Sequence, residues 1–303
     1  MYFFFKMLHD SRKKVKIFYK INFLGVNMAI IVLARELAAL GDETAKELCS
    51  MLPGYHYINK KEIEETLHER GITEKMIGRY GEKKPGFFDV FSSAQNQFLH
   101  HLKTVLYEKT ESGNCILVGQ GAPVLLKGVP GVVTFRLICP ENIRIQRIMK
   151  RFNCDERRAQ LMMTHTDNDR VGFNRYFFDV GWRDPINYDF IINTERLNAA
   201  QTAGIIKNIL PQLVDEKQEN ECKTAISNLI TGQKILTKVL YEEKLPIYFL
   251  EALYDGKSVT LNGVTNAPSS IEKVSNIAKE ITGCDEVHSN IYIASDIPMT
   301  HEV

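Results

Sequence analysis

Four short and almost continuously apolar runs limit the fold of this chain more than any other feature. They are AIIVL at 29–33, CILV at 115–118, VVTFRLI at 132–138 and FIIN at 190–193. A strand with one solvated face alternates apolar and polar residues, so unbroken apolar runs indicate strands that are covered on both faces. Segments with helical spacing separate these runs, which is typical of a parallel sheet between two layers of helices. We therefore expect a three-layer α/β fold.

A change of pattern near residue 214 indicates a second, smaller domain. Residues 28–214 contain all four apolar runs and form the first predicted domain. The run DEKQENE at 215–221 has almost no apolar residues and is the best candidate for a linker. Residues 222–296 then predict helix, strand, strand, helix and strand, which is a small α+β (αββαβ) domain. Two domains agree with a length of 303 residues.

The first 27 residues fit neither domain. An apolar stretch at 1–5 is followed by lysines and an arginine, which is the reverse of a secretory signal. We expect residues 1–27 to be a disordered extension or the product of an upstream start codon, and a weak amphipathic surface anchor is the alternative. No apolar run approaches the roughly 20 residues of a membrane span. The sequence therefore predicts a cytoplasmic protein.

The charge balance and the cysteines argue against two classes of function. The chain has 38 lysines and arginines against 37 aspartates and glutamates, a net charge of +1. Proteins that bind nucleic acid through general electrostatics usually carry a positive excess, so we expect no nucleic-acid partner. The six cysteines form no C-x-x-C pair, so we expect reduced thiols and no zinc or other metal site within the protein.

Four stretches of the first domain resemble the cytidylate kinase-like family. They are IIVLARELAALGDETAKELC at 30–49, Gln95 with CILVGQGA at 115–122, FRLICPENIRIQRIMKRF at 135–152 and DNDRVGFNRYFFDVGWRDPINYDFIINTERL at 167–197. The resemblance implies a P-loop kinase fold. It also implies transfer of the γ-phosphoryl group of a nucleoside triphosphate to a small acceptor, such as a nucleoside monophosphate, with ATP and Mg²⁺ as cofactors. The expected partner is a nucleotide or another phosphorylated small molecule.

The same resemblance assigns the candidate site residues. A loop before a helix would hold the donor phosphates through its backbone N–H groups. Arginines at 151–178 would close over the transferring group, because guanidinium forks match phosphate oxygens; the alternative is a solvated basic helix face. The candidates are Ala38, Ala39, Leu40, Gly41, Asp42, Glu43 and Thr44 for the nucleotide, Arg151, Arg170 and Arg175 for catalysis, and Gln95, Gln120 and Arg147 for the substrate.

Several positions depart from the pattern of the family. Its loop is glycine-rich, roughly Gly-Ser-Gly-Gly, whereas this chain has AALG at 38–41. Side chains there crowd a backbone that must approach phosphate and adopt positive φ angles. Asp42 stands where a basic residue is usual, and Gln120 replaces the arginine of a Gly-Arg-Gly turn. Two hypotheses stay open: a phosphotransferase with a degraded loop, or an inactive pseudokinase that acts as a regulatory or binding protein.

The second domain resembles a BON domain. The stretch that carries this resemblance is DGKSVTLNGVTNAPSSIEKVSNIAKEITGCDEVHSNIYI at 255–293. BON domains are usually binding elements, so the resemblance implies a protein or membrane-surface partner. The alternative is a small adaptor or dimerisation module.

Overall fold

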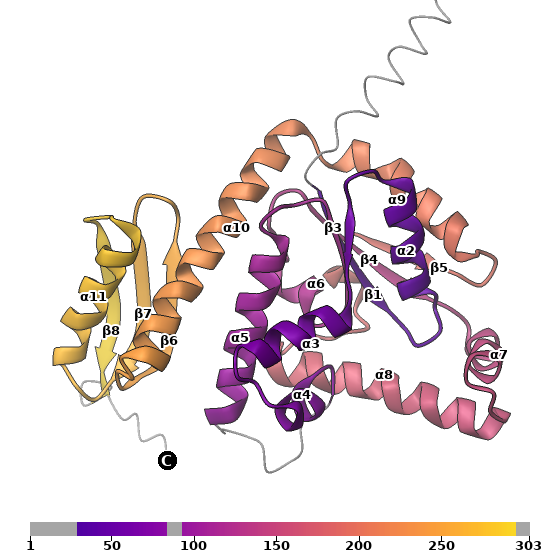
Figure 1. The fold of residues 1–303 in the computed structure, drawn as a ribbon, viewed down its shortest axis with the longest axis horizontal. Coiled ribbons are helices and arrows are strands. Elements are labelled where there is room, and N and C mark those ends of the chain that lie inside the picture. The colour runs from indigo at the N-terminus through magenta and orange to yellow at the C-terminus, as the bar shows by residue number, and fades with distance from the viewer. Residues whose placement is uncertain (1–28, 84–92, 295–303) are drawn as a thin grey trace, which may run out of the picture. The chain divides into compact units, whose positions relative to one another are not determined.

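The computed structural model describes residues 29–83 and 93–294 (Figure 1). The predicted N-terminal extension, residues 1–27, lies outside the described residues. The chain divides into two compact units, 1–223 and 224–303, and each is described by itself.

The first unit is built on a five-stranded sheet in which every neighbouring pair is parallel. The strand order is β2-β3-β1-β4-β5. The apolar runs became strands as predicted, and β1 and β3 are buried along their whole length. The predicted α/β fold with a parallel sheet is confirmed. The strands are β1 (Ile30–Arg35), β2 (His56–Ile58), β3 (Cys115–Val118), β4 (Val132–Ile138) and β5 (Phe190–Asn193).

Helices cover both sides of this sheet. Apolar residues of α2 and α9, such as Leu48 and Ile206, pack with Ile31, Ile116 and Phe135 of the strands in one buried core. Figure 1 shows α2 and α9 on one side of the sheet and α5 and α6 on the other. The helices are α2 (Gly41–Met51), α3 (Lys60–Glu69), α4 (Glu74–Tyr80), α5 (Ser93–Thr110), α6 (Ala122–Leu125), α7 (Glu141–Phe152), α8 (Glu156–Phe178), a 3-10 turn (Pro185–Asn187), α9 (Ala199–Leu213) and α10 (Glu216–Thr237).

The carboxyl ends of the three central strands meet at one edge of the sheet. Leu33 of β1 lies in register with Val118 of β3 and Phe135 of β4. The loop at 36–40 and the turn at 119–121 therefore leave the sheet side by side. In open parallel sheets, ligands bind beyond the carboxyl ends of the strands. This edge is where the candidate site is to be sought.

The polar run at 215–221, predicted as a linker, lies almost entirely within the first turns of α10. Glutamate, lysine and glutamine are good helix formers, so the run forms a largely exposed helix, in which Glu219 is buried, rather than an irregular segment. The boundary between the two units, after residue 223, falls inside α10. Whether this run separates two independently folding domains stays a prediction.

The second unit has a small mixed sheet. Its strands β6 (Ile247–Tyr254), β7 (Val259–Thr265) and β8 (Val287–Ile293) pair in the order β6-β7-β8, the first pair antiparallel and the second parallel. The last part of α10 continues into a π-helical turn (Lys238–Glu242), and α11 (Ser269–Thr282) connects β7 to β8. The order of elements is therefore αββαβ. Val239, Leu261 and Val274 belong to its separate buried core.

No helix within 29–83 or 93–294 combines the length and the apolar composition that a bilayer span needs. Those ranges also hold no group of three or more His, Cys, Asp or Glu side chains placed to bind a metal ion. All six cysteines are free thiols.

Candidate functional site

The loop between β1 and α2 has the backbone shape of a glycine-rich loop, although two of its residues are not glycine. Ala38 and Leu40 have φ angles of 63° and 66°. This left-handed conformation costs about 1–2 kcal/mol for a residue with a Cβ atom. Leu40 is the N-cap of α2 and its side chain caps no N–H group. The first-turn N–H groups of α2 thus lack a side-chain partner at the cap, as in an anion-binding helix start.

Two arginines of α7 donate hydrogen bonds to backbone carbonyl groups of this loop. Arg147 donates to the carbonyl oxygen of Ala38 at 3.1 Å and to that of Thr194 at 2.8 Å. The Nε of Arg144 donates to the carbonyl oxygen of Leu37 at 2.7 Å. Arg147, predicted to bind substrate, is therefore bonded to backbone carbonyl groups, where it fixes the shape of the loop.

Carboxylates stand at the mouth of the loop. Asp42 and Glu43 occupy the first turn of α2. The hydroxyl group of Tyr57 donates to Asp42 at 2.5 Å, and burial together with this carboxylate raises the pKa of Tyr57. Glu43 pairs with Arg151 at 3.3 Å on the surface. Negative charge at a helix N-terminus stabilises the helix but repels a phosphate group that approaches the same point.

A buried ion network lies beneath the loop. Glu36 accepts hydrogen bonds from the backbone N–H of Cys139 at 3.1 Å, from Arg144 at 3.3 Å and from Arg136 at 3.3 Å. Arg144 also pairs with Asp167 of α8. These bonds tie the end of β1 to β4, α7 and α8. None of these residues was among the candidates predicted from the sequence. Glu36 lies in the stretch at 30–49 that carries the family resemblance, and this position was the feature that could have identified it.

A second buried cluster surrounds Glu82, which follows α4. The Nη1 of Arg35 lies 2.9 and 3.0 Å from the two oxygens of Glu82, and the backbone N–H of Gln120 donates to one of them at 2.8 Å. The Nε of Arg170 lies 3.8 Å from the other. Burial would raise the pKa of Glu82, but the two arginines outweigh it and lower that pKa to about 2. Glu82 is therefore a buried carboxylate ion.

The electrostatics of Arg170 differ from those of an exposed lid arginine. Burial and the repulsion of Arg35 lower the pKa of Arg170 to about 10, against the opposing attraction of Glu82 and Asp167. Arg170 also donates to Asp167 at 3.3 Å. Its guanidinium group is thus held between two carboxylates at the edge of the loop.

The remaining candidates lie elsewhere. Arg175 pairs with Asp179 at 3.0 Å and its side chain is 70% exposed. Gln95 of α5 accepts a hydrogen bond from the hydroxyl group of Tyr176 at 2.7 Å. The structure therefore does not bring the three arginines predicted as catalytic together at one point.

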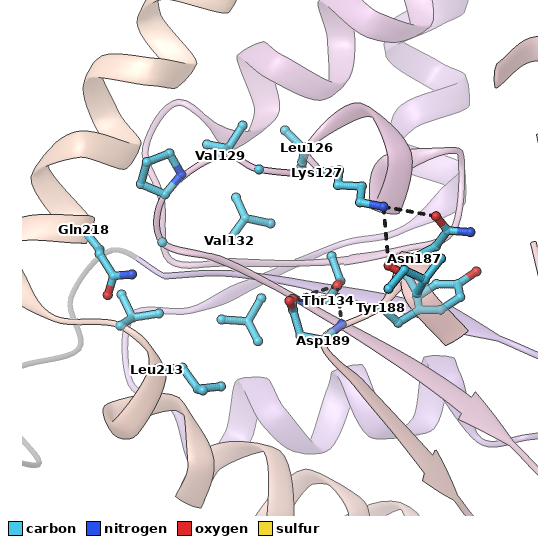
Figure 2. A pocket seen from close by; sticks show the side chains of 16 residues that line it. Leu126, Lys127, Val129, Val132, Thr134, Asn187, Tyr188, Asp189, Leu213 and Gln218 are labelled. Atoms are coloured by element: carbon cyan, nitrogen blue, oxygen red, sulfur yellow. Dashed lines mark hydrogen bonds between the residues drawn. The ribbon is translucent and has the colours of Figure 1, made fainter. Parts of the chain in front are cut away.

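One pocket lies at the opposite edge of the sheet, near the amino ends of β4 and β5 (Figure 2). Its polar groups satisfy one another: both the N–H and the hydroxyl group of Thr134 donate to Asp189 at 2.7 Å, and Lys127 donates to Asn187 at 3.1 Å. A second pocket, at the carboxyl edge, is lined by the network of Glu36 and Arg144. Only the second of these two pockets adjoins the candidate site.

The chain was compared with known proteins. The sequence profile of the cytidylate kinase-like family matches residues 30–196, which include all five strands of the first sheet and every candidate residue. A cytidylate kinase of Methanosarcina acetivorans is 26% identical over 149 residues, which is 48% of this chain and 76% of that protein. An uncharacterized protein from Eubacterium ventriosum, of known structure, is 20% identical, with a TM-score of 0.48 over 61% of this chain and 99% of its own. Shikimate kinase from Acinetobacter baumannii, solved with shikimate, is 16% identical, with a TM-score of 0.35 over 61% and 94%.

Proposed function

Because this chain belongs to the cytidylate kinase-like family, we propose that it binds a nucleotide at the loop between β1 and α2 and transfers phosphoryl groups poorly. The family supports a kinase-like, nucleotide-binding function. The observation that carries the finer proposal is a loop with a phosphate-binding backbone and an acidic mouth. The backbone of the loop favours nucleotide binding, and the carboxylates beside it disfavour efficient phosphoryl transfer.

The backbone favours an anionic ligand. Left-handed residues at 38 and 40 turn the chain so that it reaches the start of α2. N–H groups at a helix start point at an incoming anion, and the helix dipole adds to the attraction. We propose that residues 38–44 hold the phosphates of ATP in this way.

The side chains disfavour phosphoryl transfer. Catalysis of this reaction rests on positioning and on positive charge at the transferring group. In the described part of the chain, Arg147 is bonded to carbonyl oxygens, and Arg170 lies between two carboxylates. Neither guanidinium group is placed to reach a phosphate at the mouth of the loop without first leaving these partners.

The loop fits ATP better with Mg²⁺ than without it. The backbone suits phosphate oxygens, whereas the carboxylate of Asp42 repels them. Mg²⁺ is commonly bound by one or two carboxylates together with substrate phosphates, so Asp42 would suit a metal-bound nucleotide. When bound, Mg²⁺ would neutralise phosphate charge.

An active phosphotransferase is the second candidate function. The observation in its favour is that the loop keeps left-handed backbone at both substituted positions. A nucleoside monophosphate would then be the acceptor, as the resemblance implies.

Two measurements on the wild-type protein separate these functions. A thermal-shift titration with ATP and Mg²⁺ should raise the melting midpoint, because a ligand that binds only the native state stabilises it by mass action. An assay of ADP formation with a set of nucleoside monophosphates should then show slow turnover. Absence of any shift at millimolar nucleotide would reject nucleotide binding, and fast turnover would establish the active enzyme.

We also propose that the second unit is a BON-like binding module. The αββαβ order and the resemblance at 255–293 support this proposal. Such a module would contact a protein or a membrane surface. Its strands carry exposed apolar side chains whose substitution by serine would test that contact: Tyr248, Phe249, Leu253 and Tyr292.

A further inference from the structure

One edge of the sheet in the second unit is open. The strand order β6-β7-β8 gives β8 a neighbour on one side only among the described strands (Figure 1). Ser289 points to the same face of β8 as the buried Ile291, yet it is exposed, so no described helix covers the middle of this edge. An edge strand presents a row of unpaired N–H and C=O groups, which is a template for pairing with another chain.

β8 has none of the features by which proteins block an open edge. Charged side chains, proline, bulges and very short strands are the usual means. β8 has seven residues, VHSNIYI, without proline, lysine, arginine or a carboxylate, and it pairs with β7 regularly at every position. Its one basic side chain, His288, pairs with Glu286 at 3.0 Å. The strand is therefore able to accept a further neighbour.

The opposite edge of the same sheet is interrupted. The register of β6 with β7 shifts between Tyr248 and Glu251, which marks a β-bulge. Phe249 lies in this bulge with a φ angle of 53°. A Cβ atom on Gly263 of β7 would lie 3.2 Å from the carbonyl oxygen of Tyr248, so a glycine makes room for the bulge. Only the β8 edge is regular, and two copies that pair through one edge each form a closed dimer rather than a fibre.

The sequence of β8 is complementary to itself. A second copy that pairs antiparallel about a twofold axis through Asn290 would set Val287 opposite Ile293 of that copy. It would likewise set His288 opposite Tyr292 of that copy. Residues that lie opposite each other in an antiparallel pair point to the same face of the sheet. This register therefore places apolar residues of the core face together and pairs the whole of β8 with itself.

The two neighbouring twofold registers match less well. An axis through Ser289 would set the aromatic side chain of Tyr292 opposite the carboxylate of Glu286. An axis through Ile291 would leave Val287 without an opposite residue in β8 of the second copy. Register in a sheet is set by the pattern of apolar residues on the buried face. The register centred on Asn290 is therefore the best match of the three.

Pairing in this register would cover apolar surface without bringing like charges together. Tyr292 is 66% exposed and lies in one cross-strand row with Val264 and Tyr248. In the joined sheet this row would continue onto His288 of the second copy, and cross-strand aromatic pairs stabilise sheets. Val287, which packs at the margin of the core, would gain an apolar neighbour. A single short strand makes a small interface, so we expect a weak dimer that depends on protein concentration.

We propose that two copies of this chain pair through β8 in antiparallel orientation, with Asn290 on the twofold axis, so that the two small sheets join into one. The proposal rests on the function proposed for the second unit, a binding module, and names its partner as a second copy of the chain. It is independent of whether the first unit binds nucleotides.

Asn290→Lys tests the proposed edge. Asn290 is exposed, and two lysines would face each other on the axis, so the dissociation constant of the dimer should rise by about tenfold or more. Analytical ultracentrifugation of the full chain over a range of concentrations measures this constant. Asn262→Lys on β7 is the matched control. Both variants add one positive charge to the same face and lose the 3.0 Å hydrogen bond from Asn290 to Asn262, but Asn262 lies one strand away from the edge.

Neither variant changes the exposed apolar side chains whose substitution by serine tests contact with another protein or a membrane. Loss of the dimer can therefore be told apart from loss of that other contact. Asn290→Asp tests the register. Alone it should also weaken the dimer, whereas its mixture with Asn290→Lys should associate at least as well as wild type, because opposite charges then face each other on the axis.

Three results would overturn the proposal: a wild-type chain that stays monomeric at submillimolar concentration, a dimer that Asn290→Lys leaves unchanged, or a mixture of the two variants that does not associate. If the monomeric chain dimerises once residues 295–303 are removed, that segment of the same chain occupies the edge instead. A measurement on the wild type needs no variant to fold. Amide hydrogen exchange at 287–293 should slow as protein concentration rises, and exchange that is independent of concentration would equally overturn the proposal.

Discussion

Asp42→Asn tests the acidic mouth of the nucleotide loop directly. Asp42 lies in the first turn of α2, and its carboxylate accepts the hydrogen bond of Tyr57 at 2.5 Å. Asparagine can keep an oxygen in the same place and removes only the charge. Any change in ligand affinity can then be assigned to electrostatics.

Two effects of opposite sign are expected from this substitution. The loss of a negative charge at the N-terminus of α2 should lower the free energy of unfolding by about 0.3–1 kcal/mol. The loss of a like charge beside bound phosphates should strengthen the binding of metal-free ATP by about 1–2 kcal/mol, which is about five- to thirtyfold. A variant that is less stable and yet binds more tightly would be hard to explain by a general change in folding.

Calorimetric titration with ATP, with and without Mg²⁺, measures the affinity, and urea denaturation measures the stability. Glu47→Gln is the matched control, because it removes the same charge from α2 beyond its first turn. Unchanged affinity in Asp42→Asn would mean that the phosphates do not bind at this helix start. Weaker binding of Mg²⁺–ATP in Asp42→Asn would identify Asp42 as a ligand of Mg²⁺, and weaker binding of metal-free ATP would refute the repulsion argument.

Three further predictions concern the same edge of the sheet. The combined change Ala38→Gly, Leu40→Gly and Asp42→Arg should tighten ATP binding by roughly tenfold or more. It places glycines at the two left-handed positions and adds a guanidinium group that can bind phosphate. No gain in affinity by calorimetry would contradict our interpretation of the loop. Gly119→Ala should lower the free energy of unfolding by more than about 2 kcal/mol, because its Cβ atom would meet Glu82 at 2.2 Å and its φ angle is 75°. A variant as stable as wild type in urea would show that Glu82 and Arg35 can move aside at little cost. The pKa of Glu82 is lowered from its ordinary 4.5 to about 2. The ionised carboxylate therefore stabilises the fold by on the order of 3 kcal/mol above pH 4.5, and this contribution is lost as the pH falls toward 2. The stability difference between wild type and Glu82→Gln should shrink over that pH range, and a constant difference would contradict this prediction.

The sheet could be predicted because burial determines residue type along whole strands. Runs such as CILV at 115–118 have no polar residue that a solvated face would need, and they became strands at nearly the predicted bounds. The loop at 38–44 could be located because a strand and a helix bracket it. The polar run at 215–221 shows the limit of this reasoning: an exposed helix and an irregular linker have the same composition, and composition alone does not separate them.

The contacts of the candidate site could not be predicted, because a charged residue looks the same in a sequence whether it is solvated or paired. Glu82 lies 47 residues from Arg35 and 38 residues from Gln120 in the chain. Nothing in the sequence around Glu82 distinguishes it from the other acidic residues of a polar segment. Arg170 was singled out by resemblance, yet its pairing with Glu82 depends on how α8 packs against the loop. Pairings of this kind are decided by tertiary structure.

The charged side chains beyond the end of β1 form two regions. The first is acidic, and the second holds two arginines. At the start of α2, Asp42 and Glu43 meet a ligand that approaches the helix N-terminus. At the turn after β3, Arg35 and Arg170 pair with Glu82, which also accepts the backbone N–H of Gln120. The two regions are electrostatically linked, because the carboxylate of Asp42 also attracts the guanidinium groups of Arg35 and Arg170. We therefore expect the protein to bind ATP weakly, and we expect substitutions of Asp42 to affect both regions.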